Sequence, residues 1–406
     1  MLASAFTMSA GTPFHDRTAP VNAKLAWGDW AGRFAAAAYA DHHDIEYNAL
    51  RNAAGLIDVS PLYKYELSGP DAAVLVDRVV TRDAAKLAVG QVMYTPWCDE
   101  RGKVIDDGTV ARLDEQRFRW TAADPTYRWL LLNAGELDVE VRDVTDDTGA
   151  LSLQGPHARS VLEAATGEGF GDLGYFRRRA AAIDGVDIDV SRTGYTGDLG
   201  YELWIPAADA GRVWDALMEA GSDHALRPVG IRAMDVARVE AGLILIEVDY
   251  TSVRHAMTAE HEYSPFEIGL ARLVNFAKPD FVGRRALAME RERGGPRRRL
   301  VGLHVDWEGI EGRFARHDLP PAVEATVSRD PVPLVARRGQ VGRATSTCWS
   351  PMLKRMIALA SVDRRCEAPG TRVAMEWSVD GERGWVQATV EPLPFLDLPR
   401  KRETDV

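Results

Sequence analysis

The stretch SRTGYTGDLGYELW, from Ser191 to Trp204, carries the decisive pattern of this chain. Glycines recur in it at every third position, and aromatic and acidic residues fill the gaps. The flanking segments VDIDV and YELWIP alternate apolar and polar residues, so the stretch predicts a β-hairpin centred on Tyr195–Gly197. A tight turn needs only one or two glycines. The other special residues therefore indicate that this hairpin does more than reverse the chain.

The second strand of the hairpin presents a carboxylate among apolar neighbours. Because side chains alternate along a strand, Glu202 and Trp204 share one face. The opposite face is apolar and holds Tyr201, Leu203 and Ile205. A carboxylate in such a setting needs hydrogen-bond donors. Either a structural arginine supplies them, or a ligand with two adjacent N–H groups binds bidentately, as the 2-aminopyrimidinone edge of a pterin would.

Length and composition limit the possible functions. The chain has 406 residues, enough for two or three domains. Its 60 acidic and 49 basic side chains give a net charge of -11, which argues against non-specific binding of nucleic acid or membranes. Three isolated cysteines predict no disulfide framework, and no Cys/His cluster predicts a metal site. The sequence shows no signal peptide or membrane-spanning run, so we expect a cytoplasmic protein.

The chain mixes helical and strand patterns up to about Val274 and is mostly strand and turn beyond it. Residues 90–123, GQVMYTPWCDERGKVIDDGTVARLDEQRFRWTAA, predict three antiparallel strands with turns at Asp99–Gly102 and Asp114–Gln116. The basic run RERGGPRRR, Arg291–Arg299, is the best candidate for a linker to a separate β domain. The fold class is therefore α+β.

Several motifs in a fixed order carry a family resemblance. SRTGYTGDLGYELW closely resembles the signature of the glycine-cleavage T-protein (aminomethyltransferase) superfamily. TPFHDRTAP, YNALRNAAGLIDVSPL and GKVIDDGTV are similar to earlier segments of that family, and LSLQGPHA, MDVARVEAGL and SPFEIGL follow in its order. FVGRRAL and ATSTCWSPMLKRMIALASV resemble its C-terminal domain. The resemblance thus covers nearly the whole chain.

The resemblance implies a three-domain cloverleaf with tetrahydrofolate in a central channel. The folate-binding domain would be discontinuous, formed by residues 1–60 and 145–275. Residues 61–144 would form a second α+β domain with the catalytic strand, and residues 276–406 a C-terminal β-barrel-like domain. The resemblance also implies site residues. Glu202 would grip the pterin and Asp106 would act beside the folate nitrogens; the further cofactor-binding residues would be Tyr195, Tyr94, Arg238 and Phe176.

The chain departs from the T-protein pattern in ways that bear on the one-carbon donor. Met234 stands where T-proteins carry an arginine. The connection LILIEVDYTSVRHAMTAEHEYSP is longer than its T-protein counterpart and supplies polar and aromatic residues beside the expected site. We therefore expect catalytic contributions from Tyr250, His255 and His261, with Tyr263 as another candidate for the donor pocket. A surface loop with solvated histidines is the alternative, and the wide histidine spacing argues against a metal site.

These departures favour a tetrahydrofolate-dependent one-carbon transferase that takes a methyl or methylene group from a small molecule, such as an aryl methyl ether. Tyrosine, histidine or arginine from the extended loop would then stabilise the leaving group. A glycine-cleavage aminomethyltransferase that acts on a lipoyl carrier protein is the first alternative. A non-enzymatic folate-binding assembly factor is the second, although neither Cys348 nor Cys366 matches the cysteine motif of that branch.

Overall fold

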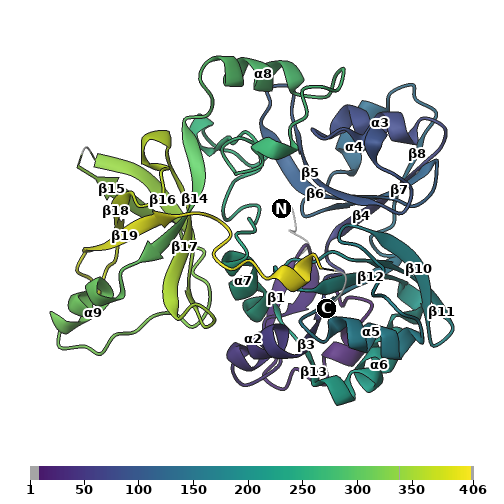
Figure 1. The fold of residues 1–406 in the computed structure, drawn as a ribbon, viewed down its shortest axis with the longest axis horizontal. Helices are drawn as coiled ribbons and strands as arrows, with labels where there is room; N and C mark the ends of the chain where they lie inside the picture. Colours follow the sequence, from purple (N-terminus) through teal and green to yellow (C-terminus); the bar gives the residue numbers. More distant parts are fainter. Residues whose placement is uncertain (1–8, 338, 404–406) are drawn as a thin grey trace, which may run out of the picture.

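The computed structural model describes residues 9–337 and 339–403. Three lobes surround the centre of the molecule, and each is built on its own β-structure (Figure 1). This arrangement, with a closed C-terminal barrel, is the α+β cloverleaf that the sequence predicts. Each β-structure draws its strands from one of the three predicted ranges, while the exact domain boundaries stay a prediction.

The first lobe is a six-stranded sheet in the order β10-β11-β12-β9-β3-β13. Apolar side chains of this sheet pack with two helices, α5 (Ala158–Thr166) and α6 (Ala210–Ala220), into one buried core. The strands are β3 (Ala54–Asp58), β9 (Thr148–Gln154), β10 (Arg178–Ile183), β11 (Val186–Ser191), β12 (Gly200–Pro206) and β13 (Leu226–Pro228). The predicted hairpin is therefore β11–β12 in the middle of this sheet.

The second lobe is a five-stranded sheet in the order β5-β6-β7-β4-β8. The three strands predicted between residues 90 and 123 are confirmed as an antiparallel meander. Helices α3 (Ala72–Val79) and α4 (Tyr127–Ala134) bury one face of the sheet. The strands are β4 (Tyr63–Ser68), β5 (Val92–Cys98), β6 (Val104–Arg112), β7 (Arg117–Ala122) and β8 (Glu140–Asp143).

The third lobe is a closed barrel of six strands, which removes free sheet edges. One helix that the sequence analysis did not predict, α9 (Trp307–Ala315), packs against it through Ile310. The strands are β14 (Arg298–Val305), β15 (Val332–Ala336), β16 (Gly339–Ser350), β17 (Arg355–Asp363), β18 (Arg372–Glu376) and β19 (Trp385–Glu391). The start of β14 coincides with the end of the predicted linker.

Several segments join the lobes. Helices α2 (His43–Asn52) and α7 (Ile231–Glu240) pack together with barrel residues in a shared core. Helix α8 (Arg284–Glu292) lies in the range predicted for the barrel domain, yet its Leu287 packs on Cys98 and Val104 of the second lobe. Helix α1 (His15–Thr18) and the ribbon of β1 (Trp27–Trp30) and β2 (Arg33–Ala36) precede the first lobe.

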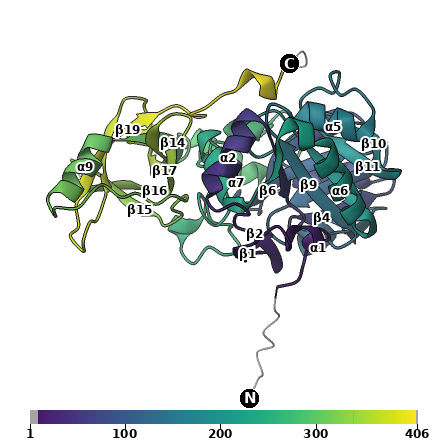
Figure 2. The same ribbon diagram turned by 90° about the horizontal axis from the view of Figure 1, so that it is seen from below.

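The C-terminal segment leaves the barrel and returns to the first lobe (Figure 2). Leu396 N–H donates to the Glu240 carbonyl at 2.9 Å, and the short helix η7 (Pro399–Lys401) follows. Arg400 then pairs with Asp198 of the hairpin loop at 2.6 Å. In the described part of the chain, no helix has the length and apolar character needed to cross a membrane.

Candidate active site

The hairpin's unusual composition has a structural cause. Strand pairing places Ser191 opposite Glu202 and Asp189 opposite Trp204. Gly197 adopts a φ of 73°, a conformation that favours glycine. A Cβ at Gly200 would lie 2.2 Å from the Gln154 side chain, so only glycine fits there. The glycines therefore let the hairpin pack closely on strand β9.

The predicted division of strand β12 into two faces is confirmed. Tyr201, Leu203 and Ile205 lie in the core of the first lobe, whereas Trp204 joins the cluster around α2 and α7. Glu202 shares the face of Trp204 and is half-buried. The remaining acidic residue of the stretch, Asp198, is buried and accepts hydrogen bonds from Arg51 and Arg400. Of the two carboxylates between Ser191 and Trp204, Asp198 is thus structural, whereas Glu202 forms no ion pair with a described residue.

Glu202 accepts a short hydrogen bond from the Thr193 hydroxyl. The nearest candidate for a structural arginine, Arg119, pairs instead with Asp189 at 2.6 Å and lies over the Trp204 ring at 4.1 Å. Burial raises the pKa of Glu202, while the Thr193 hydrogen bond and the charge of Arg119 lower it. Thr193 can satisfy only part of the acceptor capacity of a carboxylate. The site therefore fits a ligand with paired N–H donors.

A second carboxylate, Asp107, is held by two phenols. The Tyr94 hydroxyl donates to Asp107 Oδ2 at 2.5 Å, and the Tyr250 hydroxyl donates a short hydrogen bond to Oδ1. Strand register explains the first contact, because Tyr94 pairs with Thr109 and Pro96 pairs with Asp107, which puts Tyr94 and Asp107 on one face. Burial raises the pKa of Asp107, and the hydrogen bonds from Tyr250 and Tyr94 lower it.

The structure does not favour the predicted role of Asp106. Its partner across the β5–β6 ladder is Trp97, which lies in the core beneath α3 and α4, so Asp106 faces away from the phenols. Its Oδ2 accepts the backbone N–H groups of Ala123 and Asp124, both at 2.9 Å, and its Oδ1 accepts that of Asp107 at 2.8 Å. Burial and the charge of Asp107 raise the pKa of Asp106. Asp106 therefore anchors the loop after β7.

Tyr195 connects the hairpin to the extended loop. Its hydroxyl donates to the Ile244 carbonyl at the start of that loop. Burial raises its pKa, the charge of Arg238 lowers it, and the charge of Asp107 raises it again. Tyr94 and Tyr250 thus hydrogen-bond Asp107, whereas Tyr195 bonds the Ile244 carbonyl and belongs to the same hairpin as Glu202.

Arg238 is buried in an ion-pair network, and its predicted contact with the cofactor stays a prediction. Its guanidinium pairs with Asp235 at 2.7 Å and with Asp249 at 2.5 Å, and donates to Ser346 of the barrel at 2.8 Å. One of its nitrogens also donates to the Leu243 carbonyl. With each guanidinium nitrogen engaged, Arg238 joins α7, the extended loop and β16.

Phe176 lies where the hairpin meets the second lobe. Its carbonyl accepts the Val92 N–H at 2.9 Å and its own N–H donates to the Arg192 carbonyl at 3.0 Å. Its φ of 59° is uncommon for a residue with a side chain, and its ring packs edge-on against Tyr175 at 4.6 Å. Contact between Phe176 and a pterin stays a prediction.

Among the described residues, three of the four loop residues singled out from sequence make no hydrogen bond with Asp107: His255, His261 and Tyr263. His255 Nδ1 donates a hydrogen bond to the Glu247 carboxylate at 3.0 Å, and its Nε2 lies 3.8 Å from Asp124. It lines a separate cavity of about 570 Å³ with Arg254, Trp129 and Leu132. The Tyr263 hydroxyl accepts a hydrogen bond from Arg343 at 2.6 Å, and the Tyr263 ring lies under the guanidinium of Arg298.

His261 belongs to the short helix η4 (Ala259–His261) and makes no side-chain hydrogen bond to the residues around Asp107 in the described part of the chain. Its predicted catalytic role therefore has no geometric support. Of the predicted loop residues, Tyr250 is the one in contact with the carboxylate, and it is 1% exposed.

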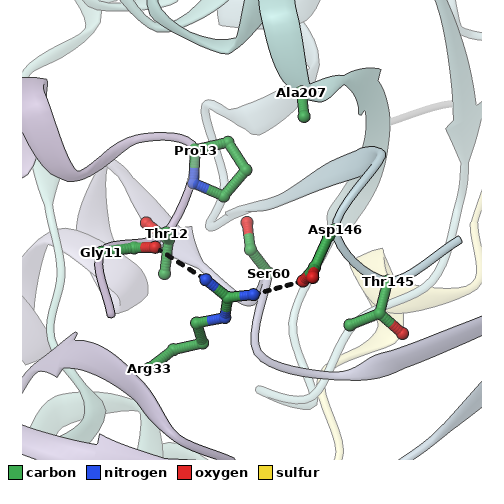
Figure 3. Close-up of a pocket in the computed structure, with 8 residues that line it drawn as sticks. All are labelled: Gly11, Thr12, Pro13, Arg33, Ser60, Thr145, Asp146 and Ala207. Atoms are coloured by element: carbon green, nitrogen blue, oxygen red, sulfur yellow. Dashed lines mark hydrogen bonds and ion pairs between the residues drawn. The ribbon is translucent and has the colours of Figure 1, made fainter. Parts of the chain in front are cut away.

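Thr12 and Pro13, which begin the N-terminal motif TPFHDRTAP, line a different cavity of about 310 Å³ (Figure 3). Arg33 crosses this cavity, donating to the Gly11 carbonyl at 3.2 Å and pairing with Asp146. The Thr12 hydroxyl donates to Asp58 at 2.5 Å. These contacts fasten the N-terminal segment to strand β3 and to the loop before β9, and neither Glu202 nor Asp107 lines the cavity.

Comparison with known proteins agrees with this arrangement. Residues 14–278 match the GCVT N-terminal domain model, and residues 298–397 match the glycine cleavage T-protein C-terminal barrel domain model. The chain belongs to the glycine-cleavage T-protein family. Members of this family use tetrahydrofolate and include named aminomethyltransferases, so the chain is an enzyme of a one-carbon transferase family.

Individual relatives in the T-protein family carry different names. An aminomethyltransferase of Symbiobacterium thermophilum is 37% identical over 88% of this chain and 90% of its own length. A trimethylamine-oxide aldolase of Ruegeria pomeroyi is also 37% identical, over 97% of this chain but 48% of its own length, so the chain spans about half of that protein. The solved structure of the glycine cleavage aminomethyltransferase of Bartonella henselae has a TM-score of 0.79 at 26% identity, covering 96% of this chain and 98% of that one.

Proposed function

We propose that this enzyme binds tetrahydrofolate with the pterin edge on Glu202 and uses Asp107 beside the reacting nitrogens. The observation that carries the proposal is the Tyr94–Asp107–Tyr250 arrangement, which holds a half-buried carboxylate on the face opposite the lobe's own core. Glu202 supports the proposal because its carboxylate is engaged by Thr193 and not by an arginine. In this proposal the catalytic aspartate is Asp107, whereas the sequence predicted Asp106.

Tetrahydrofolate supplies secondary-amine nitrogens that accept a carbon unit. Asp107 is suited to hold or accept the proton of such a nitrogen, because burial raises its pKa and makes the carboxylate a stronger base. Tyr94 and Tyr250 fix its orientation through their hydroxyls. Glu202 would fix the position of the pterin ring. The orientation of the reacting nitrogen would then contribute to the rate of transfer, in addition to proton transfer by Asp107.

The donor in this proposal is a small methylated molecule. Tyr250 comes from the loop that is longer than in T-proteins, so the added segment supplies a hydroxyl directly to the proposed catalytic carboxylate. The relative named trimethylamine-oxide aldolase, which matches 97% of this chain, supports an amine-type donor. His255 lies outside the site, which weakens the case for an aryl methyl ether whose leaving group needs a histidine.

A glycine-cleavage activity on a lipoyl carrier is the second candidate, favoured by the aminomethyltransferase that matches 88% of this chain. The test offers the purified enzyme and tetrahydrofolate three donors in turn: an aminomethylated lipoyl carrier protein, trimethylamine N-oxide and a panel of methoxylated aromatics. Mass spectrometry measures 5-methyl- and 5,10-methylene-tetrahydrofolate, and an ammonia assay follows the carrier reaction. Product from a small donor, lost in Asp107→Asn, supports the proposal; turnover with the carrier alone would overturn the small-donor assignment.

A further inference from the structure

We propose that Glu247 is a positioning residue that keeps the Tyr250 hydroxyl on Asp107. Tyr250 lies in the extended loop three positions after Glu247, which closes the turn between them with its backbone and grips the chain beyond it with its carboxylate. The inference rests on the proposed function, because it concerns the hydrogen bond to the carboxylate proposed as the base. Among the described residues, the Glu247 side chain makes no hydrogen bond with Asp107 itself.

The backbone of Glu247 adopts a conformation that favours glycine. Its φ is 62°, in the left-handed region, where residues with side chains are strained and tend to gather at functional sites. In this conformation the Glu247 N–H donates to the Tyr250 carbonyl at 2.7 Å, which closes a tight turn. Glycine would form the same turn without the strain. A glutamate at this position therefore points to a role for its carboxylate.

The Glu247 carboxylate holds the chain on the other side of Tyr250. Its Oε1 accepts the Ser252 N–H at 3.0 Å and the His255 Nδ1–H, also at 3.0 Å. The His255 side chain is 47% exposed, and exposed charged contacts contribute little, so the Ser252 contact carries the positioning. Glu247 thus holds the Tyr250 carbonyl with its backbone and the amide two residues later with its side chain.

Ser252 in turn fastens this turn to the strand that carries Asp107. Ser252 is fully buried, and its hydroxyl donates to the Ile105 carbonyl of β6 at 2.6 Å. The N–H of the next residue also donates to a β6 carbonyl, at 2.8 Å. The path from β6 through Ser252 to Glu247 therefore sets where the Tyr250 hydroxyl meets the carboxylate. Because hydrogen bonds weaken steeply away from their optimal distance and angle, a small shift along this path weakens that contact.

Glu247→Gly tests the proposal, because it removes the carboxylate and keeps the turn. Burial raises the pKa of Asp107 and the Tyr250 hydrogen bond lowers it, so a weakened bond should let this pKa rise further. The acidic limb of the pH–rate profile should then move to higher pH, by about half a pH unit. Glu247→Gln keeps an acceptor oxygen for the Ser252 N–H and should leave the limb within about 0.2 pH units of the wild-type position. Turnover is followed with whichever of the three donors above yields product.

A double variant separates positioning from a direct effect of the Glu247 charge. Loss of that charge by itself would move the limb to lower pH, because a nearby negative charge raises the pKa of a carboxyl group. In Tyr250→Phe no hydroxyl is left to position, so adding Glu247→Gly should move the limb no further upward. An equal upward shift in both backgrounds would overturn the inference, because Glu247 would then act without Tyr250. Asp318→Gly is the matched control: Asp318 is an exposed acidic residue of the third lobe with a φ of 53°, and its replacement should leave the limb in place.

Binding and stability measurements distinguish the remaining outcomes. Tetrahydrofolate affinity, measured by calorimetry, should change less than about twofold in Glu247→Gly. A lower melting temperature with an unmoved acidic limb would make Glu247 a structural residue of the loop; this inference would then fail while the proposed function stands. If the wild-type enzyme bound no tetrahydrofolate, or if Asp107→Asn kept full turnover, the proposed function would fall and this inference with it.

Discussion

Asp106 and Asp107 are neighbours on strand β6, and their carboxylates lie on opposite faces of the sheet. Asp107 accepts hydrogen bonds from Tyr94 and Tyr250, whereas Asp106 accepts the backbone N–H groups of Ala123 and Asp124. One aspartate is therefore available beside the proposed ligand and the other anchors a loop. This contrast yields the first prediction.

Asp107→Asn should lower turnover by roughly 10²-fold or more, the scale of a lost general base, while tetrahydrofolate binding changes little. Asp106→Asn should instead destabilise the fold, by about 1–3 kcal/mol, because an amide cannot accept all three backbone N–H groups of the anchored loop. Steady-state kinetics and denaturant unfolding of both variants check this. If Asp106→Asn alone abolished turnover in a stably folded protein, the original assignment from sequence would be restored.

Tyr250→Phe should shift the pH dependence of turnover. The Tyr250 hydroxyl stabilises ionised Asp107 and so lowers its pKa; without it that pKa rises further above its ordinary range. Because a protonated Asp107 cannot accept a proton, the acidic limb of the rate profile should move to higher pH, by up to roughly one pH unit. His255→Gln is the matched loop control and should leave the profile in place. An unchanged limb in Tyr250→Phe would argue against Asp107 as the base.

Glu202→Gln should weaken tetrahydrofolate binding about ten- to hundredfold, since a charge-assisted contact contributes roughly 1.5–3 kcal/mol. Binding should also depend on pH. Burial raises the pKa of Glu202, so affinity is greatest where the carboxylate is ionised and is lost as pH falls through that raised value. Calorimetry over a pH series measures both effects. Wild-type affinity in the folded variant would remove Glu202 from the site.

Arg238→Met should destabilise the protein by about 3–5 kcal/mol, because it leaves the buried Asp249 without its cation. Asp235 keeps a second partner, Arg329, at 2.8 Å. Arg316→Met, an exposed substitution on the barrel, should change stability by no more than about 0.5 kcal/mol. The melting temperatures of the two variants give the comparison. A drop in folate affinity at unchanged stability would instead return Arg238 to the ligand site.

Local patterns in the sequence predicted much of this fold. The two faces of strand β12 follow from alternation alone, and the meander of β5, β6 and β7 follows from its turns. The ordered motifs identified the family, because each motif matched in sequence what the family models match over residues 14–278 and 298–397. Alternation also singled out Glu202, as a carboxylate in an apolar strand.

What only the tertiary structure decided is which face, and which partner, each polar group meets. Alternation shows that Asp106 and Asp107 point apart, but the long-range packing of α3 and α4 determines which face is the core. The sequence predicts Arg238 as a cofactor-binding residue and gives no sign that it pairs with Asp249 and donates to Ser346 of the barrel. Tyr250 and His255 are five positions apart on one loop, yet the loop's path past strand β6 takes one to Asp107 and the other to a separate cavity. Contacts between segments far apart in the chain decide such choices, and local sequence carries no record of them.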